Sequence, residues 1–354
     1  MKTKHKIYTA LATVFVAGFL LKTLYQAGQF KTIEPQFKGS VKVLEGYNGV
    51  EDITIHPVKN IAYMAGDDRF SMWHGEPKQG AIYRLDLDNP NAKPQNISAH
   101  LDMEIHPHGI SLFHDPAEGD YLFVVDHTNY EHRILQFVYT ELLGLEYIRE
   151  FKDPVMMDSP NDVVALDGNR FYFTNDHGSG NPFIQKIEEY LQLGLSNVVY
   201  FDGNDYKLAS DGMAYANGVN ISADHKLVYV AATVDRMIYV FSRFSEEGDL
   251  LMLDKIPLYT GIDNIEIDEF GALWVACHPK MLDFVAHSKD KVKPSPSQVY
   301  KVKWEAKDDY CIEKIYEETG ETISGSSVAA VRGNNMLIGP VFDDKILWCK
   351  LTAE

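Results

Sequence analysis

The stretch Gly49-Val50-Glu51-Asp52-Ile53-Thr54-Ile55-His56-Pro57 begins a predicted β-strand with two adjacent carboxylates. Apolar residues alternate along it, which is the pattern of a strand, so Glu51 and Asp52 point to different sides of the backbone. Two carboxylates are costly to place in a packed interior unless a cation or a hydrogen-bond donor meets them. The stretch therefore predicts a strand whose start needs a positively charged or hydrogen-bonding partner.

Variants of this opening recur along the chain, and the repeat predicts the fold. The other five are His106-Pro107-His108-Gly109-Ile110-Ser111, Ser159-Pro160-Asn161-Asp162-Val163-Val164, Ala216-Asn217-Gly218-Val219-Asn220-Ile221, Gly261-Ile262-Asp263-Asn264-Ile265-Glu266 and Ser324-Gly325-Ser326-Ser327-Val328-Ala329. A turn and a second apolar strand follow each opening, and a third strand follows most of them. The openings are separated by roughly 45 to 65 residues, near the period of a four-stranded propeller blade. We therefore predict an all-β fold, a six-bladed β-propeller.

The two ends of the chain are expected to close the ring. Only three strands fit after the last opening, which leaves one blade without its outer strand. Residues 41–44 form a short predicted strand ahead of the first opening. We expect this strand to complete the last blade, with residues 26–40 serving as a tether.

The amino-terminal segment is predicted to be a hydrophobic helix. Lys2, Lys4 and Lys6 precede a low-polarity run over residues 7–21, which has the length of a signal-peptide core. The basic residues favour a cytoplasmic amino terminus, which places the rest of the chain across the membrane. We expect residues 1–30 to be an uncleaved signal anchor, with a cleaved signal peptide as the alternative, and residues 31–354 to be the six-bladed propeller domain, extracytoplasmic or secreted.

Charge and cysteine content exclude some classes of protein. The net charge of −18 argues against nucleic acid as a partner. Three cysteines, Cys277, Cys311 and Cys349, cannot all pair within the chain, so no disulfide framework is indicated.

One helix is expected within the propeller, over residues 182–195. Its apolar residues are spaced for one helical face: Ile184, Ile187, Tyr190, Leu191 and Leu195. Such a helix has no place inside a blade, so we expect it at one end of the ring. Covering a pocket, contacting a membrane and simply capping the propeller all remain open.

The strand openings supply the candidate metal ligands. Because the innermost strand of each blade begins at the central channel, residues at equivalent strand starts converge there although they are far apart in sequence. The converging residues are Glu51, Asp52, His108, Asn161, Asp162, Asn217, Asp263 and Asn264. Carboxylate and amide oxygens without thiolates suit calcium better than zinc or copper.

These motifs together resemble the serum paraoxonase/arylesterase family from about residue 41 to the carboxyl end. The resemblance is carried by Gly-Val-Glu-Asp at 49–52, His-Pro-His-Gly-Ile-Ser at 106–111, Pro-Asn-Asp-Val-Val-Ala at 160–165, Ala-Asn-Gly-Val-Asn-Ile-Ser at 216–222 and Leu-Trp-Val-Ala-Cys-His-Pro at 273–279. It implies a six-bladed propeller that holds two calcium ions and hydrolyses aryl esters and lactones.

The resemblance also implies residue roles. The catalytic calcium would be held by Glu51, Asn161, Asn217, Asp263 and Asn264, and a structural calcium by Asp52, Asp162 and the backbone carbonyl of Ile110. His108 and His127 would form the base, with His278 and Asp176 near the substrate pocket. Two departures stand out. Ser40 replaces the cysteine that pairs with the equivalent of Cys349 in vertebrate members, and residues 70–73 and 281–284 do not match the family's pocket walls.

We therefore expect a calcium-dependent esterase or lactonase that acts on a small ester or lactone and contacts the membrane through its amino-terminal segment. One alternative is a gluconolactonase-like hydrolase with a single metal, against which the presence of both Asp52 and Asp162 argues. The other is a non-catalytic, membrane-tethered propeller that assists a partner protein, against which the presence of His108 argues.

Overall fold

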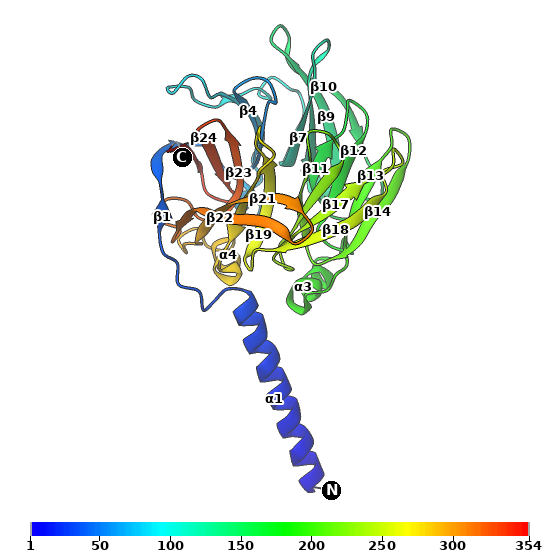
Figure 1. The fold of residues 1–354 in the computed structure, drawn as a ribbon, viewed down its shortest axis with the longest axis vertical. Helices are drawn as coiled ribbons and strands as arrows, with labels where there is room; N and C mark the ends of the chain where they lie inside the picture. Colours follow the sequence, from blue (N-terminus) through cyan, green and yellow to red (C-terminus); the bar gives the residue numbers. More distant parts are fainter. Residues whose placement is uncertain (1, 353–354) are drawn as a thin grey trace.

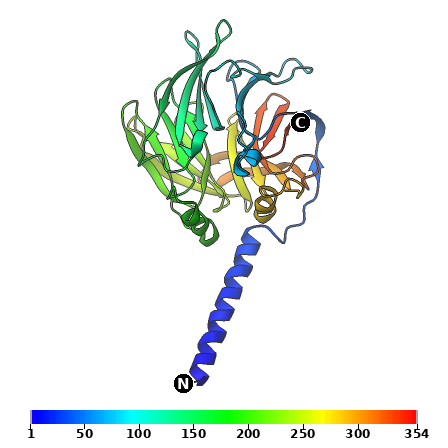
Figure 2. The same cartoon turned by 180° about the vertical axis from the view of Figure 1, so that it is seen from behind.

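The computed structural model describes residues 2–352 and confirms the six-bladed β-propeller. Six antiparallel sheets surround a central channel, and an amino-terminal helix projects away from them (Figures 1 and 2). In each blade the innermost strand is the one that begins at a repeated opening, as the openings predict.

The first three blades follow one another along the chain without exchange of strands. From the inner to the outer strand they are blade one, β3 (Val50–Ile55), β4 (Ile61–Gly66), β5 (Ala81–Asp86) and β6 (Gln95–Asn96); blade two, β7 (Pro107–Asp115), β8 (Gly119–Asp126), β9 (Arg133–Thr140) and β10 (Gly144–Phe151); and blade three, β11 (Pro160–Ala165), β12 (Phe171–Asn175), β13 (Ser196–Phe201) and β14 (Tyr206–Met213).

The last three blades include the strands that come from the amino-terminal part of the chain. They are blade four, β15 (Ala216–Ile221), β16 (Leu227–Ala232), β17 (Met237–Arg243) and β18 (Leu250–Pro257); blade five, β19 (Gly261–Ile267), β20 (Leu273–His278), β21 (Ser297–Ala306), β22 (Asp309–Glu318) and the added β1 (Gln36–Phe37); and blade six, β23 (Ser326–Arg332), β24 (Asn335–Pro340), β25 (Lys345–Leu351) and β2 (Gly39–Glu45).

The ring is closed by pairing between the two ends of the chain, as predicted. β2 runs antiparallel to β25 from Gly39 opposite Leu351 to Glu45 opposite Lys345, and Val41 lies opposite Cys349. The predicted tether is shorter than expected, because β1 already pairs with β22. Backbone hydrogen bonds between β2 and β25 therefore perform the closure in this chain, where Cys349 is a buried free thiol.

The hydrophobic core lies in layers between neighbouring blades. Between blades six and one, for example, Ile53, Met64 and Leu85 pack with Leu337 and Trp348, and each of the five is at least 98% buried. Burying one large apolar side chain contributes about 1.5–3 kcal/mol. Because a layer of this kind recurs at every blade interface, the strand starts at the channel are held in fixed relative positions.

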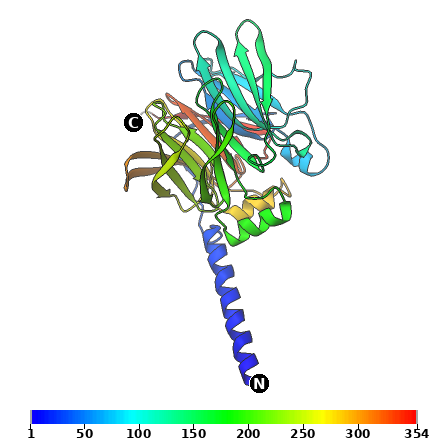
Figure 3. The same ribbon diagram turned by 90° about the vertical axis from the view of Figure 1, so that its right-hand side faces the viewer.

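One long helix and four short ones flank the propeller in the described residues. They are α1 (Lys2–Gln26), α2 (Arg69–Trp73), the 3₁₀ helix η1 (Thr128–Tyr130), α3 (Pro182–Leu191) and α4 (Met281–His287). α1, α3 and α4 lie at the same end of the ring (Figure 3), and the Met281 N–H donates to the Ala27 carbonyl at 2.9 Å, which ties α1 to α4. α3 confirms the predicted helix but ends earlier, because Gln192 adopts the left-handed conformation and caps it. Residues 70–73 and 281–284, which do not match the pocket walls of the paraoxonase/arylesterase family, lie in the short helices α2 and α4.

Candidate metal centre and active site

Every inner strand is irregular at its start, and this irregularity turns the candidate residues into the channel. The register shifts lie between Val50 and Asp52, Pro107 and Ile110, Pro160 and Val163, Ala216 and Val219, Ile262 and Ile265, and Ser326 and Val328. A bulge leaves one or two residues outside the ladder and re-aims their side chains. The same local feature in six blades therefore gathers polar side chains from six distant segments.

Two glycines allow the blades to approach closely at these starts. A Cβ on Gly109 would lie 2.4 Å from Asp162 Oδ1, and one on Gly218 would lie 2.6 Å from the Cα of Asn264. Real Cβ atoms do not come this close, so any larger residue would push neighbouring blades apart. Glycine at both positions keeps the candidate ligands within reach of one another.

The candidate ligands of the catalytic calcium, which we call the upper group, are buried and internally hydrogen-bonded; they are Glu51, Asn161, Asn217, Asp263 and Asn264. Asn264 Nδ2 donates to Glu51 Oε1 at 2.9 Å, and Asn217 Nδ2 donates to Asp263 Oδ1. Ser327 was missed by the sequence analysis, yet its hydroxyl lies 2.9 Å from both Glu51 Oε1 and Asp263 Oδ2. Its place in the sixth opening was the available signal. Ser327 thus joins the two carboxylates of this group.

Four oxygens in the upper group have no hydrogen-bond donor among the described residues. They are Glu51 Oε2, Asn161 Oδ1, Asn217 Oδ1 and Asn264 Oδ1. All four side chains are at least 95% buried, and an unpartnered buried oxygen costs about 1–3 kcal/mol. A cation with oxygen ligands would satisfy all of them at once. The donor set present therefore fits a hard ion such as calcium.

The electrostatics of Glu51 keep it ionised. Burial raises the pKa of its carboxyl, but the charge and hydrogen bond of His108 together with the charge of Arg69 outweigh that effect and lower the pKa to about 2. Arg69, on α2, is 4% exposed and donates to the carbonyls of Gly49 and Pro107 at 2.8 Å. The buried guanidinium of Arg69 therefore fixes the starts of two strands and favours the ionised carboxylate of Glu51 between them.

A second pair of carboxylates, Asp52 and Asp162, links neighbouring blades. Asp52 Oδ2 accepts from the Ile110 N–H at 2.7 Å, and Asp162 Oδ2 accepts from the Val219 N–H at 2.7 Å. Burial, and then the charge of a neighbouring carboxylate, raises the pKa of both. Ile110 is thus adjacent to Asp52, although the contact in this structure is made by its N–H and the predicted ligand is its carbonyl. Two desolvated carboxyls this close favour either a shared proton or a divalent cation.

Glu266 is a further acidic group that the sequence analysis did not place in the channel. Burial and the charge of Asp52 raise its pKa well above the usual range, and Asn220 Nδ2 donates to its Oε1 at 3.1 Å. It lies two residues beyond Asn264 in β19, close enough to Asp52 for the two charges to interact.

The predicted histidine pair is in contact, and a third histidine extends it. His108 Nδ1 lies 3.1 Å from His127 Nε2, and His108 Nε2 lies 3.5 Å from Glu51 Oε1. His127 Nδ1 lies 3.0 Å from Nδ1 of His132, which the sequence analysis did not single out. Burial, followed by the charge of His108, lowers the pKa of His127 well below its ordinary value. The three histidines therefore form a row that begins beside Glu51 of the upper group and leads away from it.

His278 and Asp176 both contact the upper group. His278 Nε2 lies 2.8 Å from Asp263 Oδ2, and its ring stacks on Phe284 of α4 with 3.9 Å between centroids. Asp176 accepts from Asn161 Nδ2 at 3.3 Å and pairs with His177. Burial lowers the pKa of His177, but hydrogen bonds to Asp176 and Glu189 outweigh that effect and raise the pKa to about 10. Both predicted pocket residues thus orient candidate ligands.

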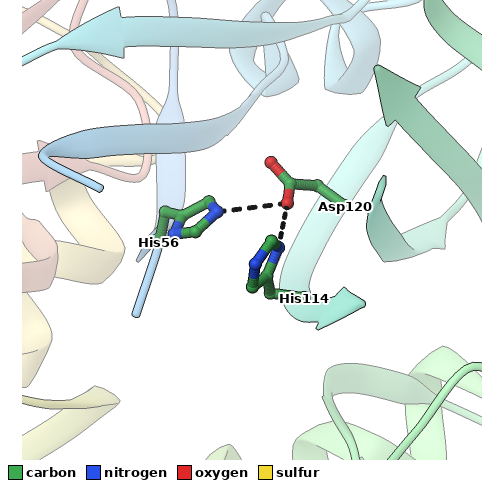
Figure 4. Close-up of side chains that lie close together, drawn as sticks. All are labelled: His56, His114 and Asp120. Carbon is green, nitrogen blue, oxygen red and sulfur yellow. Dashed lines mark hydrogen bonds and ion pairs between the residues drawn. The ribbon is translucent and has the colours of Figure 1, made fainter. Parts of the chain in front are cut away.

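A separate cluster of His56, His114 and Asp120 has the spacing of a metal site (Figure 4). It lies at the far ends of β3 and β7, away from the strand starts. His56 Nδ1 accepts from the N–H groups of Val58 and Lys59, both at 3.0 Å, so a neutral ring carries its proton on Nε2, which faces Asp120 Oδ1 at 3.2 Å. His114 Nδ1 lies 2.7 Å from the same oxygen. Hydrogen bonds from His114 and Tyr63 hold Asp120 in this cluster, and Nε2 of a neutral His56 has no lone pair for an ion.

The chain matches the arylesterase family over residues 29–351. It is 34% identical to human serum paraoxonase/arylesterase 2 over 313 residues, which is 86% of each chain. It is 32% identical to mouse serum paraoxonase/lactonase 3 over 333 residues, which is 91% of each chain. Among solved structures, a gluconolactonase from Xanthomonas campestris has a TM-score of 0.54 at 14% identity, covering 91% of this chain and 99% of that one. At that identity the solved structure shows a shared fold only.

Proposed function

This chain belongs to the arylesterase family and is a hydrolase of aryl esters and lactones, and we propose that it works with two calcium ions held between the strand starts. The observation that carries the proposal is the set of four buried, unpartnered oxygens at the upper group. They come from blades one, three, four and five, so one ion would join four blades.

The upper ion would be held by the predicted set. Glu51 and Asp263 supply two formal negative charges, which offset one divalent cation, and Asn161, Asn217 and Asn264 add amide oxygens. Ser327 and His278 are not needed as ligands, because their hydrogen bonds to Glu51 and Asp263 orient those carboxylates.

The deeper ion would lie between Asp52 and Asp162, with the Ile110 carbonyl as a further ligand. These carboxylates also supply two charges, and both already accept backbone N–H groups from a neighbouring blade. Their raised pKa values reflect desolvation and mutual repulsion, which a cation would relieve. We infer a structural role for this ion.

When bound, the upper calcium supplies Lewis-acid polarisation of the ester carbonyl and stabilises the charge that develops on its oxygen. The chain's own contribution is proton transfer. His108 Nε2 takes a proton from the attacking water and returns it to the leaving group, which is an alkoxide for a lactone and a phenoxide for an aryl ester. Glu51 is held by hydrogen bonds from Asn264 and Ser327 and lies beside Nε2 of His108, so the proton transfer would occur at this nitrogen. Phe284, stacked on His278, forms an apolar wall beside the site.

Hydrolysis of phenyl acetate and a panel of lactones, with calcium and with a chelator, tests this proposal. Activity should disappear with the chelator and return with added calcium. His108→Gln should lower kcat by roughly 10²- to 10⁴-fold, the usual contribution of a general base, with little change in the melting temperature. Activity that resists chelation would contradict the metal-dependent mechanism, and full activity of His108→Gln would remove this histidine from it.

We further propose that residues 1–30 anchor the domain 31–354 to a membrane, with the domain on the extracytoplasmic side. Within the described residues one helix, His5–Gln26, is long and apolar enough to cross a membrane, and its side chains are exposed. α3 lies at the same end of the ring (Figure 3). Its apolar face leaves Phe183 73% exposed and Tyr190 49% exposed, which suits contact with lipid beside the anchor.

A further inference from the structure

Three histidines form one continuous row from the candidate active site. His108 and His127 contact through Nδ1 and Nε2 at 3.1 Å, and His127 and His132 contact through their Nδ1 atoms at 3.0 Å. Successive rings are nearly perpendicular, at 84° and 89°, with centroids 5.1 Å apart in both pairs. His132 immediately precedes β9 and is partly exposed. The row thus runs from Glu51 toward the surface.

Only one direction of hydrogen bonding along this row leaves a base in the active site. A neutral imidazole has one N–H donor and one lone-pair acceptor. If His132 donates to His127, then His127 donates to His108, and His108 carries its proton on Nε2, where no lone pair remains. If His127 instead donates from Nδ1 to His132, its Nε2 accepts from His108 Nδ1, and His108 Nε2 keeps its lone pair on the side of Glu51. Glu51 Oε1 lies 3.5 Å from this nitrogen, and the upper calcium would hold that carboxylate.

We propose that His132 is a positioning residue that accepts from His127 Nδ1–H and thereby leaves the lone pair of His108 Nε2 facing the substrate. The proposal rests on the proposed function, because it concerns the base of that reaction. The second nitrogen of a catalytic histidine is generally set by the hydrogen bond that the other one makes.

The row also provides a balanced path for the proton. When His108 Nε2 takes a proton from water, its Nδ1 proton passes to His127 Nε2, and the Nδ1 proton of His127 passes to His132 Nδ1. Three protons move by one position each, so the positive charge ends on His132, the water becomes hydroxide, and no bond between heavy atoms changes along the row. Return of the proton to the leaving group reverses the same steps.

The surroundings of His132 keep a neutral ring available. Burial lowers its pKa, the carboxylates of Asp176 and Asp158 oppose that shift, and the charge of His108 adds to it. The pKa of His127 is lowered as well. Neutral rings are what the proposed arrangement requires, because a protonated ring has no acceptor.

Two substitutions at one position separate this role from a structural one. His132→Leu removes the acceptor, and we expect kcat for phenyl acetate to fall roughly 10- to 100-fold with KM within about twofold. His132→Asp places an acceptor oxygen at the same distance along the side chain as Nδ1, and it should recover most of the lost turnover. His100→Leu, at a histidine that contacts the Leu145 carbonyl outside the row, is the matched control.

Ring ¹⁵N chemical shifts of His127 test the tautomer without relying on turnover. The calcium-loaded wild-type protein should show protonated Nδ1, and His132→Leu should move the population toward protonated Nε2. Equal loss in the Leu and Asp variants, no loss in the Leu variant, or protonated Nε2 in the wild type would each overturn the inference. A wild-type protein without esterase activity would contradict the proposed function, while the chemical shifts would still decide the tautomer.

Discussion

Asp162→Asn should separate the deeper ion from catalysis, because this carboxylate accepts a backbone N–H from the next blade and, among the described residues, has no hydrogen bond to the histidine row. Asp162 is 4% exposed and accepts from Val219 N–H in the next blade. An ion that binds only the folded protein stabilises it by about 4 kcal/mol at a calcium concentration 1,000 times its Kd. For 354 residues this corresponds to a melting shift of roughly 5 °C.

The substitution removes one charge and keeps the shape of the side chain. Asparagine presents an amide to one backbone N–H that the carboxylate now satisfies, which costs about 1–3 kcal/mol, whereas loss of repulsion with Asp52 offsets part of that cost. We therefore expect the variant and the wild type to melt at similar temperatures in chelator. In saturating calcium the wild type should rise by roughly 5 °C and the variant should not.

The same pair predicts how this shift depends on pH. Both carboxyls have raised pKa values in the calcium-free fold, so the folded state binds more protons than the unfolded state. Calcium-free stability therefore falls as pH rises from the ordinary carboxyl range through the raised folded values. Because calcium displaces these protons, its stabilising effect should be smaller at pH 5 than at pH 8.

Thermal unfolding followed by circular dichroism across a calcium titration at both pH values is the measurement. Asp211→Asn, at an exposed position on β14, is the control for loss of one negative charge. If calcium raised the melting temperature of Asp162→Asn as much as that of the wild type, Asp162 would not hold an ion.

Three further expectations concern other parts of the molecule. Glu51→Gln should slow ester hydrolysis at least tenfold and weaken its calcium dependence, because one charge of the upper group is lost. Its melting temperature in chelator should stay close to the wild-type value, because the size of the side chain is kept. An unchanged rate across a calcium titration would contradict this. Deleting residues 1–30 removes no blade strand, so the product should partition into the soluble fraction with wild-type kcat, and a full-length protein whose amino terminus by mass spectrometry lies near Gln26 would identify a cleaved signal. The pKa of His177 is raised to about 10, so its ion pairs stabilise the fold fully below its ordinary value near 6.5 and lose that effect as pH rises toward 10; His177→Gln should flatten this part of the stability profile measured by urea unfolding.

Much of the fold could be predicted from the sequence, because its signals are local and repeated. Alternating apolar residues after each opening predict a strand, and six openings at a regular spacing predict six blades. The strand over residues 41–44 was assigned to the last blade by counting alone, and β2 confirms it. β1 and the short helices α2 and α4 were missed, since two to seven residues carry too little periodicity to be recognised.

The sequence by itself determined which oxygens are available, since Glu51, Asp52, Asn161, Asp162, Asn217, Asp263 and Asn264 all stand at the strand openings. Only the closed ring shows which atoms face one another. Ser327 bridges Glu51 and Asp263, which lie 276 and 64 residues away along the chain, and His132 extends the histidine row beyond η1. The physical reason is that hydrogen-bond partners and unpartnered oxygens depend on bulges and side-chain directions at six blade interfaces, and these are fixed only when the ring closes.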